Sequence, residues 1–95
     1  MTGDETTKAR VVIMGRVQGV GFRYWTQDQA RHLGLDGWVR NRRDGSVEAL
    51  FAGPAAAVRE MLATCWRGPT FSRVTDVVEE DTTDEDAPIG FHITR

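Results

Sequence analysis

Hydrophobic and polar positions follow two different periods along this chain, and each change of period marks an expected element. Apolar residues at helical spacing predict two helices, over residues 22–33 and 55–66. Alternation with a period of two, or a short β-branched run, predicts five strands, over residues 10–16, 36–41, 46–52, 72–81 and 89–93. The first of these strands is too apolar throughout to face solvent on either side.

Glycine and proline mark where these elements end. Gly34 is placed as the stop of the first helix. The Asp44-Gly45 pair predicts the turn of a hairpin. Gly53-Pro54 breaks the third strand, and Pro54 suits the first turn of the second helix. The valines of the fourth strand do not alternate strictly, so we expect that strand to be irregular.

The predicted order of elements is β-α-β-β-α-β with a short extra strand at the C-terminus. This order predicts an α+β fold, a ferredoxin-like sandwich with two helices on one face of an antiparallel sheet. Ninety-five residues make one domain. We assign residues 9–95 to it and residues 1–8, which lack apolar periodicity, to a flexible N-terminal tail.

Composition restricts the class of protein. At 40% hydrophobic and 27% charged residues, the chain is typical of a soluble globular protein. No apolar run approaches membrane-spanning length, and the polar start is no signal peptide. The single Cys65 excludes an internal disulfide and a thiolate zinc site. We therefore expect a cytoplasmic monomer with no membrane partner.

Residues 15–23 organise the rest of the chain. They hold three glycines in seven positions between a predicted strand and a predicted helix. Such a turn presents unpaired N–H groups at the positive end of the helix dipole, where anions bind. The positive charge of Arg23 is unfavourable at this end of the helix dipole. An anionic ligand would account for an arginine there, since a guanidinium binds oxyanions with paired hydrogen bonds.

Glycine spacing alone does not identify the ligand. The Walker pattern fails at Val20, and the dinucleotide pattern fails at Tyr24. A turn that merely requires glycine is an equal alternative on spacing alone. The charge distribution is uneven: residues 1–47 carry a net +3 and residues 48–95 a net −5. The positive half includes Arg16, Arg23, Arg40, Arg42 and Arg43, a field that attracts small anions, although Arg42 and Arg43 also fit solvated surface positions.

Two longer motifs resemble signatures of the acylphosphatase family. Residues 13–23, Ile-Met-Gly-Arg-Val-Gln-Gly-Val-Gly-Phe-Arg, are similar to its first signature. Gly37-Trp38-Val39-Arg40-Asn41, followed after three residues by Gly45-Ser46-Val47, is similar to its second. The resemblance extends through the closing 91–93 strand. The N-terminal tail lies outside it, and the acidic loop before Ile89 is longer than the core fold requires.

The resemblance implies an enzyme of the same fold that hydrolyses the carboxyl–phosphate bond of small acyl phosphates. The substrate partner is then a small acyl phosphate and the product inorganic phosphate, with no cofactor and no metal. Arg23 and Asn41 match the two catalytic residues of the family, so the resemblance implies that they are the catalytic pair. The phosphate is held by the 16–22 loop and Arg23, with substrate-binding N–H groups from Gln18, Gly19, Val20, Gly21 and Phe22, while Asn41 orients water.

The chemistry is consistent with so few residues. An acyl phosphate has a weakly basic carboxylate as leaving group and needs no strong general acid. Phosphoryl transfer has a loose transition state, so positioning and charge stabilisation carry most of the rate. The amide of Asn41 cannot accept a proton from water, so we expect a phosphate oxygen of the substrate to accept it.

Other chemistry-bearing residues are assigned structural places. We expect His32 and His92 on the surface, Cys65 in the core, and the three tryptophans in packing contacts. Two isolated histidines make no metal site. The acidic residues of 81–86 are expected to form a solvated loop.

Two other function classes fit part of the sequence. One is a phosphate- or carbamoyl-phosphate-binding module, since similar domains occur fused in hydrogenase-maturation carbamoyltransferases; the end of the chain at Arg95 favours the separate enzyme. The other is binding of single-stranded RNA, which needs exposed aromatic residues on the first and third strands. Residues 11–14 have none and Phe51 is assigned to the core face, so we expect no nucleic-acid partner.

Overall fold

A computed structural model of the chain describes residues 5–82 and 85–95. Its elements follow the predicted order, with bounds β1 Thr6–Arg16, α1 Phe22–His32, β2 Asp36–Asn41, β3 Val47–Pro54, α2 Ala55–Cys65, β4 Arg73–Glu80 and β5 Phe91–Ile93. β2 has the predicted bounds. Each helix ends one residue earlier than predicted. The α+β prediction is confirmed.

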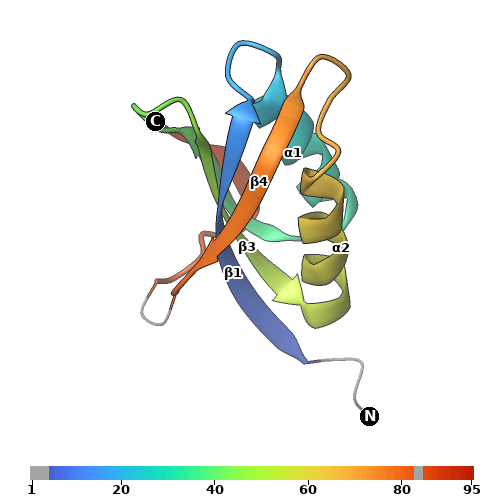
Figure 1. Ribbon diagram of the computed structural model, residues 1–95. Coiled ribbons are helices and arrows are strands. Elements are labelled where there is room, and N and C mark those ends of the chain that lie inside the picture. The colour runs from blue at the N-terminus through green and yellow to red at the C-terminus, as the bar shows by residue number, and fades with distance from the viewer. Residues whose placement is uncertain (1–4, 83–84) are drawn as a thin grey trace.

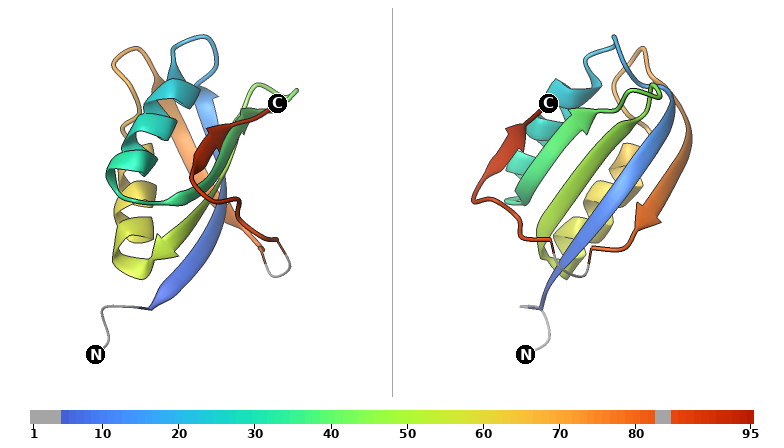
Figure 2. Two further views of the ribbon diagram at one scale, coloured as in Figure 1. Left: turned by 180° about the vertical axis from the view of Figure 1, so that it is seen from behind. Right: turned by 90° about the vertical axis from the view of Figure 1, so that its left-hand side faces the viewer.

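The strands form one sheet in the order β4-β1-β3-β2-β5. Both helices cover the same face of this sheet and leave the other face open (Figures 1 and 2). β1, β2, β3 and β4 pair antiparallel, as predicted, whereas β5 pairs parallel with β2. The sheet is therefore mixed, because the chain crosses from β4 at one edge to the opposite edge before it forms β5.

The first strand is longer than the sequence predicts. Thr6 pairs with Pro54 and Thr7 pairs with Gly53, so β1 begins before residue 10 and β3 extends past residue 52. Residues 6–8, which the sequence pattern placed in the tail, thus belong to a strand. The Gly53-Pro54 break was predicted too early because cross-strand pairing with β1 overrides it. Residues 1–4 of the predicted tail lie outside the described residues.

The last strand is shorter than predicted. Ile89 is 92% exposed and precedes β5, contrary to the expected alternation. Gly90 separates it from the strand, with its N–H donating to Asp36 Oδ1 at 2.8 Å. The expected irregularity of β4 is confirmed by a shift of register against β1 between Met14 and Gly15.

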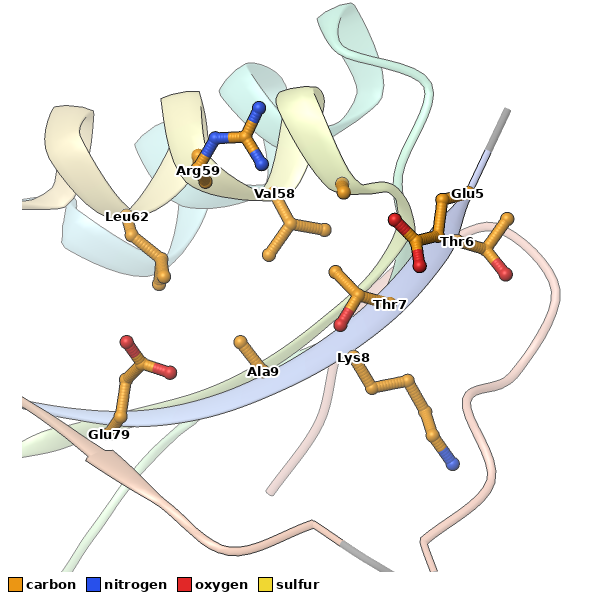
Figure 3. Close-up of a pocket in the computed structure, with 10 residues that line it drawn as sticks. Glu5, Thr6, Thr7, Lys8, Ala9, Val58, Arg59, Leu62 and Glu79 are labelled. Carbon is orange, nitrogen blue, oxygen red and sulfur yellow. The ribbon is translucent and has the colours of Figure 1, made fainter. Parts of the chain in front are cut away.

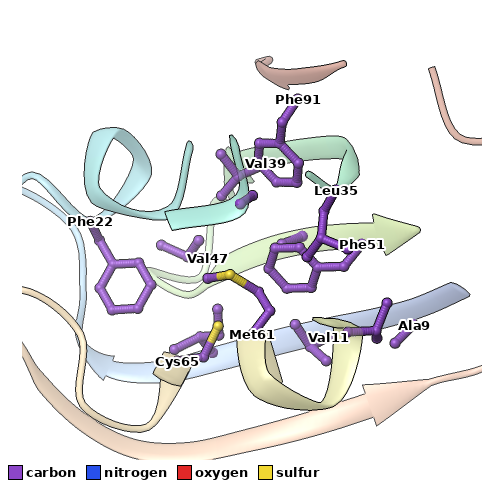
Figure 4. Packing of buried hydrophobic residues seen from close by; sticks show 14 of the residues in the cluster. Ala9, Val11, Phe22, Leu35, Val39, Val47, Phe51, Met61, Cys65 and Phe91 are labelled. Carbon is purple, nitrogen blue, oxygen red and sulfur yellow. The ribbon is translucent and has the colours of Figure 1, made fainter. Parts of the chain in front are cut away.

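The core lies between the helices and the covered face of the sheet (Figure 4). Phe51 and Phe91 stack there with their ring centroids 5.5 Å apart, and Met61 and Cys65 of α2 pack into the same cluster. Phe22, the first residue of α1, is also buried in it. Because Phe22 is anchored, the start of α1 and the loop before it are held against the sheet.

Candidate active site

The loop between β1 and α1, residues 17–21, is here named the glycine loop. It ends at Gly21, the N-cap of α1, whose φ of 79° lies in the left-handed region that favours glycine. α1 has no side-chain cap at this end and no acidic residue in its first turn. Within the described part of the chain, the main-chain N–H groups of residues 18–22 donate no hydrogen bond. These donors are therefore available to an anion.

The core holds both ends of the glycine loop. Val17 is buried at the end that follows β1, and Phe22 is buried at the end that begins α1. Thr26, also buried, donates from Oγ1 to the carbonyl oxygen of Phe22 at 2.8 Å. A loop fixed at both ends keeps its N–H groups in place before a ligand arrives, which is the preorganisation that charge stabilisation requires.

The glycine loop, the first turn of α1 and the end of β2 enclose a cavity of about 120 Å³. Its walls are formed by Val17, Gly19, Gly21, Phe22, Arg23, Tyr24 and Asn41. The fold thus brings Arg23 and Asn41, which are 18 positions apart in the sequence, to one small cavity. A guanidinium, a carboxamide and exposed N–H groups make a site for a tetrahedral oxyanion and a polar neighbour.

Asn41 is the unusual residue in this cavity. Its Oδ1 atom is buried and has no hydrogen-bond partner within the described residues. Leaving a buried acceptor unpaired costs about 1–3 kcal/mol. Asn41 is the last residue of β2, two positions after the buried Val39, so its side chain is on the helix-covered face. An unpaired acceptor in that place is suited to hold a water molecule or a donor group of a ligand.

A second contact fixes the glycine loop from outside. Gln18 Nε2 donates to the carbonyl oxygens of Arg42 at 2.7 Å and Ser46 at 2.9 Å. Both acceptors belong to the turn between β2 and β3. Asp44 Oδ1 shapes this turn by accepting from Ser46 Oγ at 2.6 Å and from the Ser46 N–H at 2.9 Å. These two hydrogen bonds, the side-chain one first, hold the pKa of Asp44 below its usual value.

Most of the predicted site residues meet in the cavity, and two do not line it. Gly19, Gly21, Phe22, Arg23 and Asn41 are in its walls. The side chain of Gln18 is directed to the β2–β3 turn instead, and Val20 packs against the hydrophobic core. Their side chains therefore position the loop, and only their main-chain N–H groups remain available for binding.

Val17 was predicted only as part of the 16–22 loop, and Tyr24 had no predicted role. Both line the cavity, Val17 as a buried wall and Tyr24 as a side chain that is 70% exposed. A signal for Tyr24 was present in the sequence, because it lies three positions after Gly21, and residues three apart share a helix face.

Of the arginines that were predicted to attract small anions, only Arg23 lines the cavity. Arg40 Nη2 lies 2.9 Å from Oε1 of the buried Glu48, and its guanidinium also lies over the Trp38 ring at 5.0 Å. Arg40 is thus held in an ion pair on the open face of the sheet. It lines a separate hollow of about 520 Å³ whose walls are Arg10, Arg40, Asn41, Arg42, Arg43, Glu48, Glu80 and Arg95.

A third hollow, of about 360 Å³, lies between the start of β1 and α2 (Figure 3). Its charged residues are mixed in sign: Glu5, Lys8, Arg59 and Glu79. It is formed by the opposite end of β1 from the glycine loop, and no predicted site residue lines it.

The remaining candidates take structural places, as predicted in most cases. His32 and His92 are exposed, and Cys65 is buried, which raises its pKa to about 12. No group of three potential metal ligands occurs in residues 5–82 and 85–95. The prediction that Trp66 makes packing contacts is wrong, because its side chain is 51% exposed.

The acidic loop is also less free than predicted. Glu85 lies 3.6 Å from Arg10, and its carbonyl oxygen accepts from Lys8. Residues 83–84 of the 81–86 cluster lie outside the described residues. No helix in the described ranges is long and apolar enough to span a membrane.

Comparisons with known proteins show the family and the fold of the chain. The family model described as Acylphosphatase matches residues 9–93. A protein of Rhizobium meliloti (strain 1021) named Acylphosphatase is 56% identical over 95 residues, which cover all of this chain and 99% of that protein. One of Nitrobacter hamburgensis with the same name is 68% identical over 71 residues, 75% of this chain and 71% of that one. The crystal structure of acylphosphatase from Bacillus subtilis superposes with a TM-score of 0.88 at 38% identity, over 96% of this chain and 100% of that chain.

Proposed function

The chain belongs to the acylphosphatase family and hydrolyses acyl phosphates, and we propose that it does so without a metal ion, by binding the phosphoryl group with the glycine loop and Arg23 and orienting water with Asn41. The substrate is a small acyl phosphate, and the products are its carboxylate and inorganic phosphate. The observation that carries the proposal is the buried, unpaired Oδ1 of Asn41 in the same 120 Å³ cavity as Arg23.

In this mechanism the phosphoryl oxygens accept hydrogen bonds from the N–H groups of residues 18–22 and from the Arg23 guanidinium. The undonated N–H groups and the uncapped start of α1 support this step. Charge on the equatorial oxygens is stabilised by donors that are already in place, so little reorganisation is needed as the reaction proceeds.

Asn41 holds the attacking water because its Oδ1 atom accepts a hydrogen bond that the water donates. The water oxygen attacks phosphorus, the bond between phosphorus and the acyl oxygen breaks, and the carboxylate leaves with the bonding electrons. The departing proton of the water passes to a phosphoryl oxygen of the substrate, since an amide accepts no proton at neutral pH. Arg23 and the loop donors offset the negative charge throughout.

The test is phosphate release from benzoyl phosphate in EDTA by the wild type, Arg23→Ala, Asn41→Ala and Arg59→Ala. Loss of one preorganised contact typically lowers the rate by about 10²–10³-fold. We expect that loss for the first two variants. Arg59→Ala removes an exposed arginine of α2 that is outside the 120 Å³ cavity, so its rate should stay within about twofold of the wild type.

Three results would contradict parts of the proposal. Activity lost in EDTA and restored by a divalent cation would show that a metal takes part. Folded Arg23→Ala and Asn41→Ala variants with wild-type rates would remove the two assigned roles. A wild type that binds inorganic phosphate but hydrolyses no acyl phosphate would favour the phosphate-binding module.

The proposal includes a monomer in the cytoplasm that has no nucleic-acid partner. The open face of the sheet supports the last point, because the side chains of β1 and β3 on that face include none of the aromatic residues that stack on RNA bases. These side chains are Arg10, Val12, Glu48 and Leu50, and all but Arg10 are buried. The lone buried thiol is consistent with a reducing compartment. Sedimentation at a mass other than 10.6 kDa would contradict the monomer.

A further inference from the structure

The mechanism leaves one part of the substrate without a contact, namely the acyl group. Of the residues that line the 120 Å³ cavity, Val17 and Phe22 are buried in the core and Gly19 and Gly21 have no side chain. Arg23 and Asn41 are assigned to the phosphoryl group and the water. Tyr24 is the remaining side chain of the cavity wall, and it is 70% exposed.

The helix directs Tyr24 toward the reacting centre. Tyr24 is the third residue of α1 and lies three positions after the N-cap Gly21, so the two share a helix face. Long side chains in helices point back toward the N-terminus, which here is the anion-binding end. A Cβ atom added at Gly19 or Gly21 would meet nothing within 4 Å, so the space above these glycines is open to a ligand.

In-line displacement decides the direction of the acyl group. The attacking and leaving oxygens lie on opposite sides of phosphorus. With water at Asn41, the acyl group extends away from the end of β2. It also extends away from the arginine-lined hollow, which Asn41 borders as well. A charged tail on the substrate is therefore not directed into that hollow.

We propose that Tyr24 is a specificity-determining residue whose ring packs against the acyl group, so that the enzyme favours acyl phosphates with an aromatic or bulky apolar acyl group over small ones. This inference rests on the proposed function. An aromatic ring at the rim contacts a planar acyl group by stacking and shields it from water. An acetyl group is too small to use the contact, and inorganic phosphate has no group to reach it.

The experiment compares kcat/KM for benzoyl phosphate and acetyl phosphate in the wild type, Tyr24→Ala and Tyr24→Phe. For Tyr24→Ala we expect about a fivefold to tenfold loss with benzoyl phosphate, the size of one aromatic contact. Its kcat/KM with acetyl phosphate and its inhibition by inorganic phosphate should stay within about twofold. Tyr24→Phe keeps the ring and should keep the wild-type ratio of the two substrates.

Ile89→Ala serves as a matched control, because it removes another exposed apolar side chain that does not line the cavity. Its substrate ratio should equal that of the wild type. If Tyr24→Ala lowers kcat/KM equally for both substrates, or lowers it for neither, the role of Tyr24 is overturned while the proposed function stands. A wild type that hydrolyses neither probe overturns the proposed function, and the role of Tyr24 with it.

Discussion

Asn41 shows how a single residue acquires its role from its surroundings. An asparagine before a turn commonly bonds to its own backbone, yet here the side-chain oxygen is buried and unpaired beside Arg23. The free-energy cost of that atom is the reason to assign it a ligand. Arg40, its neighbour in sequence, is instead neutralised by Glu48 on the opposite face of the sheet. Adjacent positions of one strand thus have different surroundings, with Asn41 in the cavity and Arg40 in an ion pair on the other face.

The residues of the cavity predict how the rate depends on pH. No histidine, cysteine or carboxylate is among its described lining residues. A histidine, or a cysteine or carboxylate with a shifted pKa, is the kind of side chain that changes charge between roughly pH 5 and 8. We therefore expect kcat to follow the ionisation of the substrate's phosphate, with no separate enzyme step. The check is a pH profile measured with two acyl phosphates whose phosphate groups ionise at different pH.

His32→Ala and His92→Ala variants control for the two exposed histidines and should have unchanged profiles. A sharp enzyme transition near neutrality that persists in both variants, and is the same for both substrates, would contradict proton transfer to the substrate.

At the scale of elements, the site depends on two segments that meet through one side chain. Gln18 ties the glycine loop to the β2–β3 turn by two hydrogen bonds, and Asp44 shapes that turn through Ser46. Because Asn41 directly precedes this turn, the same contact sets the position of the loop donors relative to Asn41. The glycine loop and Asn41, to which the proposed mechanism assigns separate roles, are therefore held in place by a side chain whose hydrogen bonds, within the described residues, go to the turn.

Gln18→Leu tests this coupling. The change removes two hydrogen bonds, while the carbonyl oxygens of Arg42 and Ser46 keep the N–H groups of Gly45 and Arg42 as donors. We therefore expect a loss of stability of about 0.5–1.5 kcal/mol for each hydrogen bond removed. A loosened loop should also lower kcat by about tenfold or more, since a displacement near 1 Å is costly to positioned chemistry. Denaturant unfolding and phosphate release from benzoyl phosphate measure the two effects.

Gln27→Leu is the matched control. Gln27 lies on helix α1 but outside the cavity, and its side chain donates to the carbonyl oxygen of Phe91 at 3.4 Å. A small stability loss with normal kcat is expected there. If Gln18→Leu loses stability but keeps its kcat, the contact is structural only and does not position the site.

Across the whole molecule, the site lies where one sheet and two helices share a core. Phe22 fastens α1 to that core, and Cys65 of α2 is enclosed in the same cluster. Burial raises the pKa of Cys65 to about 12 from 9.0, because a thiolate is poorly solvated among apolar side chains. The pKa of Cys65 is higher in the folded protein than in the unfolded protein. Its contribution to the free energy of unfolding is therefore fully present below about pH 9 and is lost as the pH rises toward 12.

We expect the Cys65 thiol to resist iodoacetamide at pH 8 in the native protein and to react on unfolding. The labelling rate, followed by mass spectrometry across a urea titration, should rise together with the loss of tertiary structure. Cys65→Ala should lower the stability by about 1 kcal/mol or more, as expected for a buried side chain that leaves a small cavity. Rapid labelling of the folded protein would contradict the burial of this residue.

Much of the fold followed from local pattern. The two helices, the bounds of β2 and the order of elements were predicted because periodicity and turn residues act within a few positions of the chain. The two motifs likewise predicted that Arg23, Asn41 and the glycines belong to one site. The ends of β1 and β3 were predicted less well, since they depend on pairing between residues almost fifty positions apart.

The amino-acid sequence by itself determined the family, the class of fold and the residue types of the site, because these are carried by short stretches of chain. The tertiary structure decided that β5 pairs parallel with β2 and that Gln18 hydrogen-bonds to the β2–β3 turn. It also decided that Arg40 forms an ion pair with Glu48 and that Tyr24 lines the cavity. The physical reason is distance along the chain. Except for Arg40 and Glu48, these contacts join segments whose meeting depends on how the layers pack, and Arg40 meets Glu48 only through the register of two strands.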